Sequence, residues 1–259
     1  MKLNHKIVGS GPPLIILHGL FGMLDNWRTV AKLLEVKFQC ILVDLRNHGK
    51  SPHTNEMNYK VMADDLHELM NTLNIPSAIF IGHSMGGKVA MQFAFDHPDK
   101  VEKLIVVDIS LKQYDRHHDH VIEAIESIEP SKLPDRTEAE NSFRKYLKGD
   151  DATIQFLLKN LSRLPQGGFE WKANMPGLII HYDSLMERID SKVEFTKPTL
   201  FIRGENSDSV RDEDWEEIQK LFTDSQQVTI SGAGHWVHAD QPKAITATIL
   251  TFTGAASNA

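Results

Sequence analysis

The chain has 259 residues and a net charge of −7 at pH 7, with 41% hydrophobic and 24% charged residues. This is the composition of a folded globular protein, and it excludes a chain that is disordered throughout. A single cysteine, Cys40, excludes an intramolecular disulfide and a cysteine-based zinc site. The acidic balance argues against a nucleic-acid partner, which would require clustered Lys and Arg.

No apolar run approaches the length of about 18 residues that spans a membrane. Residues 1–9 lack the apolar stretch of a signal peptide. We therefore expect no membrane span and a cytoplasmic location.

Short apolar runs bounded by turn residues predict β-strands. The runs are mostly continuous, as in strands that helices cover on both faces, so they indicate a mostly parallel sheet. Residues 59–73 repeat apolar side chains from Met62 to Leu73 at the spacing of one helix face, and Asn58 is the expected N-cap. Strands alternating with such helices form a doubly wound α/β sheet. The predicted strands are Leu14–Leu17, Cys40–Val43, Ala78–Ile81, Leu104–Val107, Thr199–Ile202 and Gln227–Ile230.

The connection after the fourth of these runs is too long for a simple crossover. Helix-like segments at Val121–Ile128, Asn141–Leu147 and Thr153–Leu161 are separated by prolines and by the pair Gly167-Gly168. We predict a helical cap over residues 111–195, inserted before the penultimate strand. Residues 1–110 and 196–259 then form the sheet core.

A serine lies at the apex of a strand-turn-helix sequence, Gly82-His83-Ser84-Met85-Gly86-Gly87. The glycines are expected because a Cβ beside so sharp a turn would collide with the neighbouring strand and helix. The helix behind the serine also directs free N–H groups toward a developing oxyanion. The pattern predicts that Ser84 is a nucleophile rather than part of a structural turn.

A second glycine turn, His18-Gly19-Leu20-Phe21-Gly22, follows the first predicted strand. The backbone N–H groups of Leu20 and Met85 are therefore the expected oxyanion hole. We expect His18 to be a hydrogen-bonded structural residue.

Among thirteen histidines, the best candidate for the general base is His235. It lies in Gly232-Ala233-Gly234-His235-Trp236, just after the last predicted strand, and His238 is a weaker candidate. The adjacent His117 and His118, with nearby His120, lack defined metal-ligand spacing, so we expect no metal site.

These motifs, together with Asp44–Ser51, resemble the α/β-hydrolase superfamily over the whole chain. The Arg46–Gly49 turn, Gln155–Lys159 and His235–Ala239 resemble, more narrowly, the small bacterial esterases of the YbfF type. This resemblance implies esterase or thioesterase activity on acyl substrates, a four-helix-like cap and no cofactor.

The position of the triad acid departs from the pattern of most of the superfamily. There the acid is the fourth residue of a turn after the penultimate strand, and here that residue is Ser207. Asp108, at the end of Leu104–Val107, is the favoured acid, and the YbfF-type resemblance also places it there. Asp208 stays an alternative, and so does a purely structural Asp108. We expect the Ser207 hydroxyl to bond Asp108 or His235.

The predicted function is that of a serine hydrolase acting on carboxylic esters or thioesters through an acyl-enzyme on Ser84. A serine at the apex argues against the dehalogenase and epoxide hydrolase chemistry of relatives that carry aspartate there. The alternatives are a Ser-His enzyme acting on another bond, such as a carbon–carbon hydrolase or a menaquinone-pathway enzyme, and a non-catalytic small-molecule receptor. We expect a monomer or weak dimer.

Aromatic residues are the candidates for the acyl pocket: Phe143, Tyr146 and Phe156 in the predicted cap, and Trp236 beside the base. At helical spacing the cap residues would also fit a cap core. Asp44, Arg46 and His48 are expected to fix the loop after their strand rather than to contact substrate.

Overall fold

A computed structural model describes residues 1–255 and shows a seven-stranded sheet in the order β1-β3-β2-β4-β5-β8-β9. β1 is antiparallel to β3, and every other neighbouring pair is parallel. The strands are β1 (His5–Val8), β2 (Pro13–Leu17), β3 (Gln39–Val43), β4 (Ala78–His83), β5 (Val101–Val107), β8 (Thr199–Gly204) and β9 (Ser225–Ile230). The predicted mostly parallel α/β sheet is confirmed.

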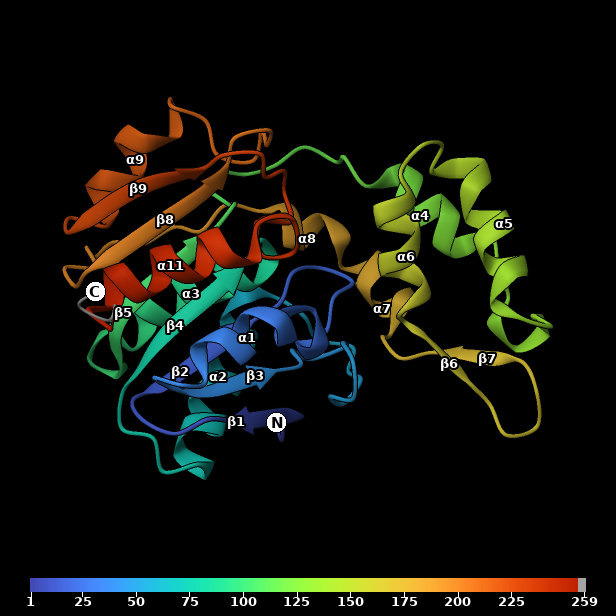
Figure 1. The fold of residues 1–259 in the computed structure, drawn as a ribbon, viewed down its shortest axis with the longest axis horizontal. Helices are drawn as coiled ribbons and strands as arrows, with labels where there is room; N and C mark the ends of the chain where they lie inside the picture. Colours follow the sequence, from blue (N-terminus) through green and yellow to red (C-terminus); the bar gives the residue numbers. More distant parts are fainter. Residues whose placement is uncertain (256–259) are drawn as a thin grey trace.

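Helices cover both faces of this sheet (Figure 1). α1 (Arg28–Leu34) and α11 (Pro242–Thr253) pack on one face, and α2 (Tyr59–Thr72) and α3 (Met85–Asp96) on the other. Successive residues of a strand point to opposite faces, so each buried strand needs apolar side chains throughout its length. The remaining elements of this part are η1 (Leu24–Trp27), η2 (Pro98–Lys100), α9 (Asp214–Leu221) and α10 (Val237–Asp240).

The predicted strands and the helix at residues 59–73 are confirmed, and the Asn58 side chain caps that helix by accepting the Val61 N–H at 2.9 Å. The sequence did not predict β1. This strand is a partly exposed edge of four residues, and a charged or polar side chain occupies half of it. It therefore lacks the continuous apolar run of the inner strands.

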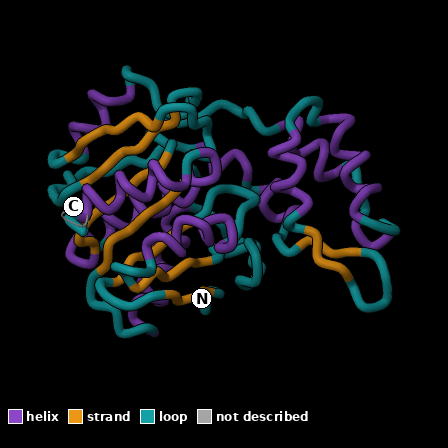
Figure 2. Tube along the Cα trace, in the orientation of Figure 1, coloured by secondary structure: helices purple, strands orange, loops and turns teal. Residues whose placement is uncertain are grey.

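Residues 111–195 contain two short strands as well as the expected helices. A two-stranded hairpin, β6 (Leu161–Arg163) and β7 (Phe169–Trp171), lies well away from the main sheet (Figure 2). The expected helix Thr153–Leu161 was wrong at its end, because α6 stops at Leu158. The helices here are α4 (Asp119–Glu126), η3 (Pro130–Lys132), α5 (Arg136–Tyr146), α6 (Asp151–Leu158), α7 (Met175–Ile180) and α8 (Tyr182–Met186).

Two glycines between β6 and β7 explain why the chain turns there to form a hairpin. Gly167 and Gly168 have φ angles of +95° and +74°, which suit a tight turn between two strands. From the sequence, this pair predicted only a break between helices. The division into core and cap at residues 110 and 195 stays a prediction. Within residues 1–255, every helix is too short or too polar to cross a membrane.

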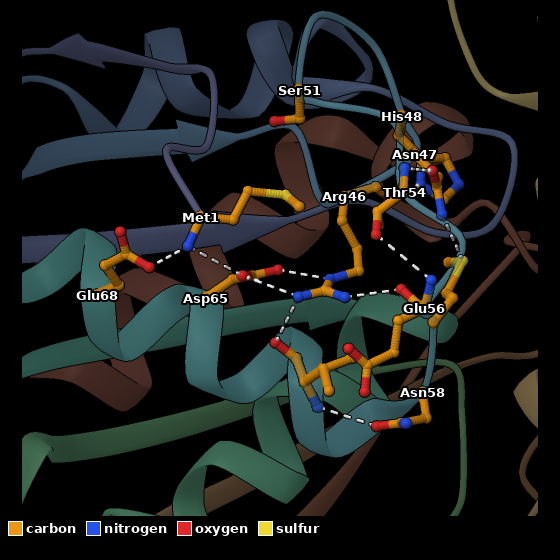
Figure 3. A network of polar contacts seen from close by, with 12 residues as sticks. Met1, Arg46, Asn47, His48, Ser51, Thr54, Glu56, Asn58, Asp65 and Glu68 are labelled. Atoms are coloured by element: carbon orange, nitrogen blue, oxygen red, sulfur yellow. Dashed lines mark hydrogen bonds and ion pairs between the residues drawn. The ribbon is translucent and has the colours of Figure 1, made fainter.

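A buried ion pair fixes the chain that follows β3. The Arg46 Nε lies 2.6 Å from Asp65 on α2, and the same guanidinium donates to the Glu56 carbonyl at 2.7 Å (Figure 3). Both charged side chains are almost fully buried, so each needs the other to offset the loss of hydration. The turn at residues 44–51 is therefore attached firmly to the sheet core.

Candidate active site

Ser84 occupies the sharp turn between β4 and α3, with φ +52° and ψ −122°. A Cβ on Gly82 would lie 2.2 Å from the Gly86 carbonyl oxygen, and a Cβ on Gly86 would lie 2.4 Å from the His18 oxygen. The Ser84 N–H donates to the Val107 carbonyl at 3.0 Å, which ties the turn to the neighbouring strand. Only glycine fits beside the serine, as the sequence pattern predicted.

Ser84 lines a cavity. The predicted residues Leu20, Met85 and His235 line the same cavity. Together with Ser84 these residues come from three separate parts of the chain, and the sheet edge at the carboxyl ends of β2, β4 and β9 brings them together. The other lining residues are Tyr59, Lys88, Ile109, Tyr114, His117, His118, Leu185, Met186 and Ser209.

Asp108 contacts the imidazole of His235. Its Oδ2 lies 2.7 Å from His235 Nδ1, and its Oδ1 accepts the Gly204 N–H at 2.9 Å. The Ser207 hydroxyl donates to the same Oδ2. Asp108 is fully buried, whereas Asp208 is exposed. The structure thus brings together the favoured carboxylate, the serine that occupies the usual acid position, and the candidate base.

A second serine, which the sequence analysis missed, joins this group. Ser209 Oγ lies 3.0 Å from His235 Nδ1 and 3.2 Å from Ser207 Oγ. The only sequence signal was its place two residues after Ser207 in the loop that follows β8. Asp108 and Ser209 therefore both lie within hydrogen-bond distance of the imidazole Nδ1.

His83, which the sequence also did not identify as part of the site, contacts the backbone of His235. Its Nε2 lies 2.8 Å from the His235 carbonyl oxygen. Burial, followed by the nearby His238 and His235, places the pKa of His83 well below its ordinary value, so the ring is neutral. Its Nε2 must then carry the proton, since only a donor can bond a carbonyl oxygen. This bond holds the backbone of the loop that presents His235.

The backbone amides of Leu20 and Met85 are free to bind an oxyanion. Within residues 1–255, neither N–H donates a hydrogen bond to a protein acceptor. Met85 is the first residue of α3, so its N–H has no partner inside the helix. Leu20 and Met85 both line the cavity that Ser84 lines.

Polar side chains of the turn after β3 hold the loop that carries Leu20. His48 Nε2 accepts the Phe21 N–H at 3.2 Å, and Asp44 Oδ1 accepts the Leu24 N–H at 2.7 Å. His18 accepts the Leu45 N–H at 3.1 Å, and burial lowers its pKa, so it remains a neutral structural residue. Asp44 also accepts the Lys50 N–H at 2.9 Å and so fixes the loop after its own strand, as expected; its hold on the loop that carries Leu20 is an additional finding.

The aromatic residues expected to bind substrate lie elsewhere. Phe143 is fully buried and stacks on Trp171 with ring centroids 6.4 Å apart, as in a cap core. Tyr146 is 41% exposed, and Phe156 packs on Trp236 at 5.1 Å. None of the four expected residues is among the described residues that line the cavity of Ser84. The cavity uses residues too scattered in the sequence to form a recognisable pattern.

The histidine cluster after β5 has a structural partner. His118 Nδ1 lies 2.8 Å from the Tyr182 hydroxyl, and burial lowers the pKa of His118 to about 3. His117 and His118 line the cavity, but His120 does not. Across residues 1–255, no three side chains of metal-binding type are grouped to hold an ion.

Comparison with known proteins agrees with this geometry. A family model described as the alpha/beta hydrolase fold matches residues 12–139. The chain is 38% identical to "Esterase YbfF" of Escherichia coli over 95% of this chain and 96% of that protein. It is also 38% identical to "sn-1-specific diacylglycerol lipase ABHD11" of Danio rerio, over 94% of this chain and 79% of the relative.

A solved structure described as "Marine microorganism esterase" superposes with a TM-score of 0.94 and 44% sequence identity. The match covers 97% of this chain and 99% of that one. The resemblance inferred from the sequence motifs is therefore confirmed. The chain belongs to the α/β hydrolase family, and the three similar proteins named here are described as esterases or as a lipase.

Proposed function

We propose that this protein hydrolyses carboxylic esters, with Ser84 as nucleophile, His235 as general base and Asp108 as the acid that orients it. The observation that carries the proposal is the 2.7 Å contact of Asp108 with His235 Nδ1, in a site where His235 and Ser84 line one cavity. An acid on Nδ1 leaves Nε2 unprotonated and able to accept the serine proton. The esterases among the relatives support this reaction class.

In the proposed reaction, Ser84 Oγ attacks the acyl carbon while His235 Nε2 takes its proton. The Leu20 and Met85 N–H groups bind the negative charge that develops on the carbonyl oxygen. His235 then gives the proton to the leaving alcohol, and water repeats the cycle on the acyl-enzyme. Asp108 stays ionised and stabilises the imidazolium formed in each half-reaction.

The cavity lining favours an apolar acyl group. Apolar contacts come from Leu20, Met85, Ile109, Leu185 and Met186. Thioesters share the acyl carbon chemistry and stay a proposed second substrate class. The residues beyond 110 and before 196 are the proposed cap that closes this cavity. Cytoplasmic location and a monomer or weak dimer stay predictions.

A panel of p-nitrophenyl and coenzyme A esters of graded chain length tests the proposal, with the wild type, Ser84→Ala and Ser77→Ala. Ser77 is a partly exposed serine bonded to Glu102, so it serves as the matched control. We expect hydrolysis by the wild type and the control, none by Ser84→Ala, and an acyl adduct on Ser84 by mass spectrometry. No hydrolysis of any ester by the wild type would refute the proposal.

A further inference from the structure

The proposed reaction gives no role to Lys88, a lysine buried beside the nucleophile. It lies on α3, one turn after Ser84, and its backbone N–H donates to the Ser84 carbonyl at 3.1 Å. Its side chain is 1% exposed and borders the cavity. No carboxylate among residues 1–255 forms a salt bridge with it. A lysine without a paired charge is rarely buried this deeply.

Backbone carbonyls hold the Lys88 ammonium group instead. Nζ donates to Lys112 O at 2.8 Å, to Met186 O at 3.5 Å and to Glu187 O. The three N–H bonds of an ammonium group match these three acceptors. Nζ also lies 4.9 Å from the centroid of the Tyr114 ring, which adds a cation–π contact.

The three carbonyls belong to two segments: the incoming segment, residues 108–118 between β5 and α4, and the outgoing segment, residues 182–198, which comprises α8 and the chain that leads to β8. Lys112 is in the incoming segment, and Met186 and Glu187 are in the outgoing one. The two segments also bond each other, through Ile189 N to Leu111 O at 2.8 Å and Tyr114 N to Met186 O at 2.9 Å. Lys88 therefore sits where both segments meet the helix that carries Ser84.

These segments also form one wall of the cavity. Ile109 and Tyr114 come from the incoming segment, and Leu185 and Met186 from the outgoing one. Their distance from Ser84 depends on how the segments are attached to α3. Loss of the Lys88 contacts would leave buried carbonyls unpaired and would release that wall.

We propose that Lys88 is a positioning residue that fastens both connecting segments to α3 and so sets the acyl length that the cavity accepts. This inference rests on the proposed function of Ser84.

Substitution Lys88→Met tests it, because methionine keeps an unbranched apolar stem and removes the three donors. Lys103→Met is the matched control: Lys103 Nζ donates to Phe252 O at 2.9 Å and lies 5.3 Å from the Phe252 ring centroid, away from the cavity. The assay measures kcat and KM for p-nitrophenyl esters from acetate to decanoate.

In Lys88→Met, we expect the ratio of kcat/KM for long over short esters to change by about tenfold, the effect of one buried hydrogen bond. The change should lie mainly in KM, because the groups that react with the substrate are intact. The Lys103→Met ratio should equal that of the wild type. A Lys88→Met ratio equal to the wild-type ratio overturns the inference. A wild type inactive on every ester refutes the proposed function instead.

Hydrogen exchange of the wild-type protein provides a test that needs neither activity nor a folded variant. Burial lowers the pKa of Lys88 to about 7. The charge of Glu187 opposes this effect, and the charges of Arg188 and Lys112 add to it. The rings of Tyr59 and Tyr114 also face the amino group. Above that pH the neutral amine has two N–H bonds for three carbonyls.

We therefore expect the amides of Tyr114 and Ile189, corrected for intrinsic exchange, to lose protection between pH 6 and pH 8.5. The Thr199 amide, which donates to Asp224 O at 2.9 Å in the sheet core, should keep its protection. Unchanged protection of Tyr114 and Ile189 across this range would overturn the inference even if Lys88→Met did not fold.

Discussion

Replacing Asp108 by asparagine probes the proposed relay most directly. In the wild type, Oδ1 accepts the Gly204 N–H and Oδ2 faces His235 Nδ1. An asparagine that keeps its oxygen toward Gly204 presents its NH₂ group to His235. The imidazole must then accept at Nδ1 and carry its proton on Nε2, where it cannot take the serine proton.

The opposite orientation of the amide is no better. It would place the NH₂ group against the Gly204 N–H, two donors facing each other at a fully buried position. Either orientation removes a bond that the site needs. The loss of the correct tautomer in a Ser-His-Asp site reduces kcat by about 10⁴, equal to about 5.5 kcal/mol of transition-state stabilisation.

The assay is the steady-state hydrolysis of p-nitrophenyl acetate by the wild type, Asp108→Asn and Asp208→Asn. We expect a kcat about 10⁴ lower for Asp108→Asn with KM changed little, and wild-type kinetics for Asp208→Asn, since Asp208 is exposed. Circular dichroism checks that both variants are folded. If Asp208→Asn loses activity and Asp108→Asn does not, Asp108 is not the acid.

Three further changes test other parts of the structure. Ser207→Ala should reduce kcat about tenfold at constant KM, because its hydroxyl bonds the buried Asp108 carboxylate rather than the substrate; an unchanged kcat would contradict this. Gly86→Ala should lower the urea midpoint strongly, since the new Cβ would lie 2.4 Å from a carbonyl oxygen, and a wild-type midpoint would show that the turn can relax. Burial lowers the pKa of His238 to about 3, whereas a histidine in the unfolded chain has a pKa of about 6.5. As pH falls, the unfolded chain therefore binds a proton at His238 before the folded protein does, and this favours unfolding. Between pH 7 and pH 5 the free energy of unfolding, measured in urea, should therefore fall by about 1–2 kcal/mol less in His238→Phe than in the wild type. An equal fall in both proteins would refute this reasoning.

The sequence predicted the parts of the site that depend on local structure. Ser84 and its glycines lie in one strand-turn-helix unit, and that unit needs no knowledge of distant contacts. The inner strands were also predicted, because burial on both faces requires continuous apolar runs. β1 and the β6–β7 hairpin were not, since short strands at an exposed edge have no comparable pattern.

The cavity wall depends on contacts between segments that are far apart in sequence. Tyr59, Tyr114 and Leu185 meet there only because the two connecting segments pack on α2 and α3. Aromatic residues at helical spacing predicted a pocket of Phe143, Tyr146 and Phe156 instead. A period of about 3.6 residues identifies the buried face of a helix, but it does not tell whether that face covers a core or a cavity.

The register of the sheet explains the position of the acid. β5 and β8 are parallel neighbours with Val107 opposite Ile202, and the Asp108 N–H donates to the Ile202 carbonyl at 2.7 Å. Asp108 therefore follows β5 at the level where the turn after β8 begins, and its φ of +51° marks a sharp change of chain direction there. A carboxylate on either strand end can reach the imidazole, and the small Ser207 and Ser209 leave room for the one from β5. Sequence spacing alone identified both carboxylates as candidates. Its position at a strand end and the family resemblance favoured Asp108, and the strand order and the contacts of its side chain give the physical reason.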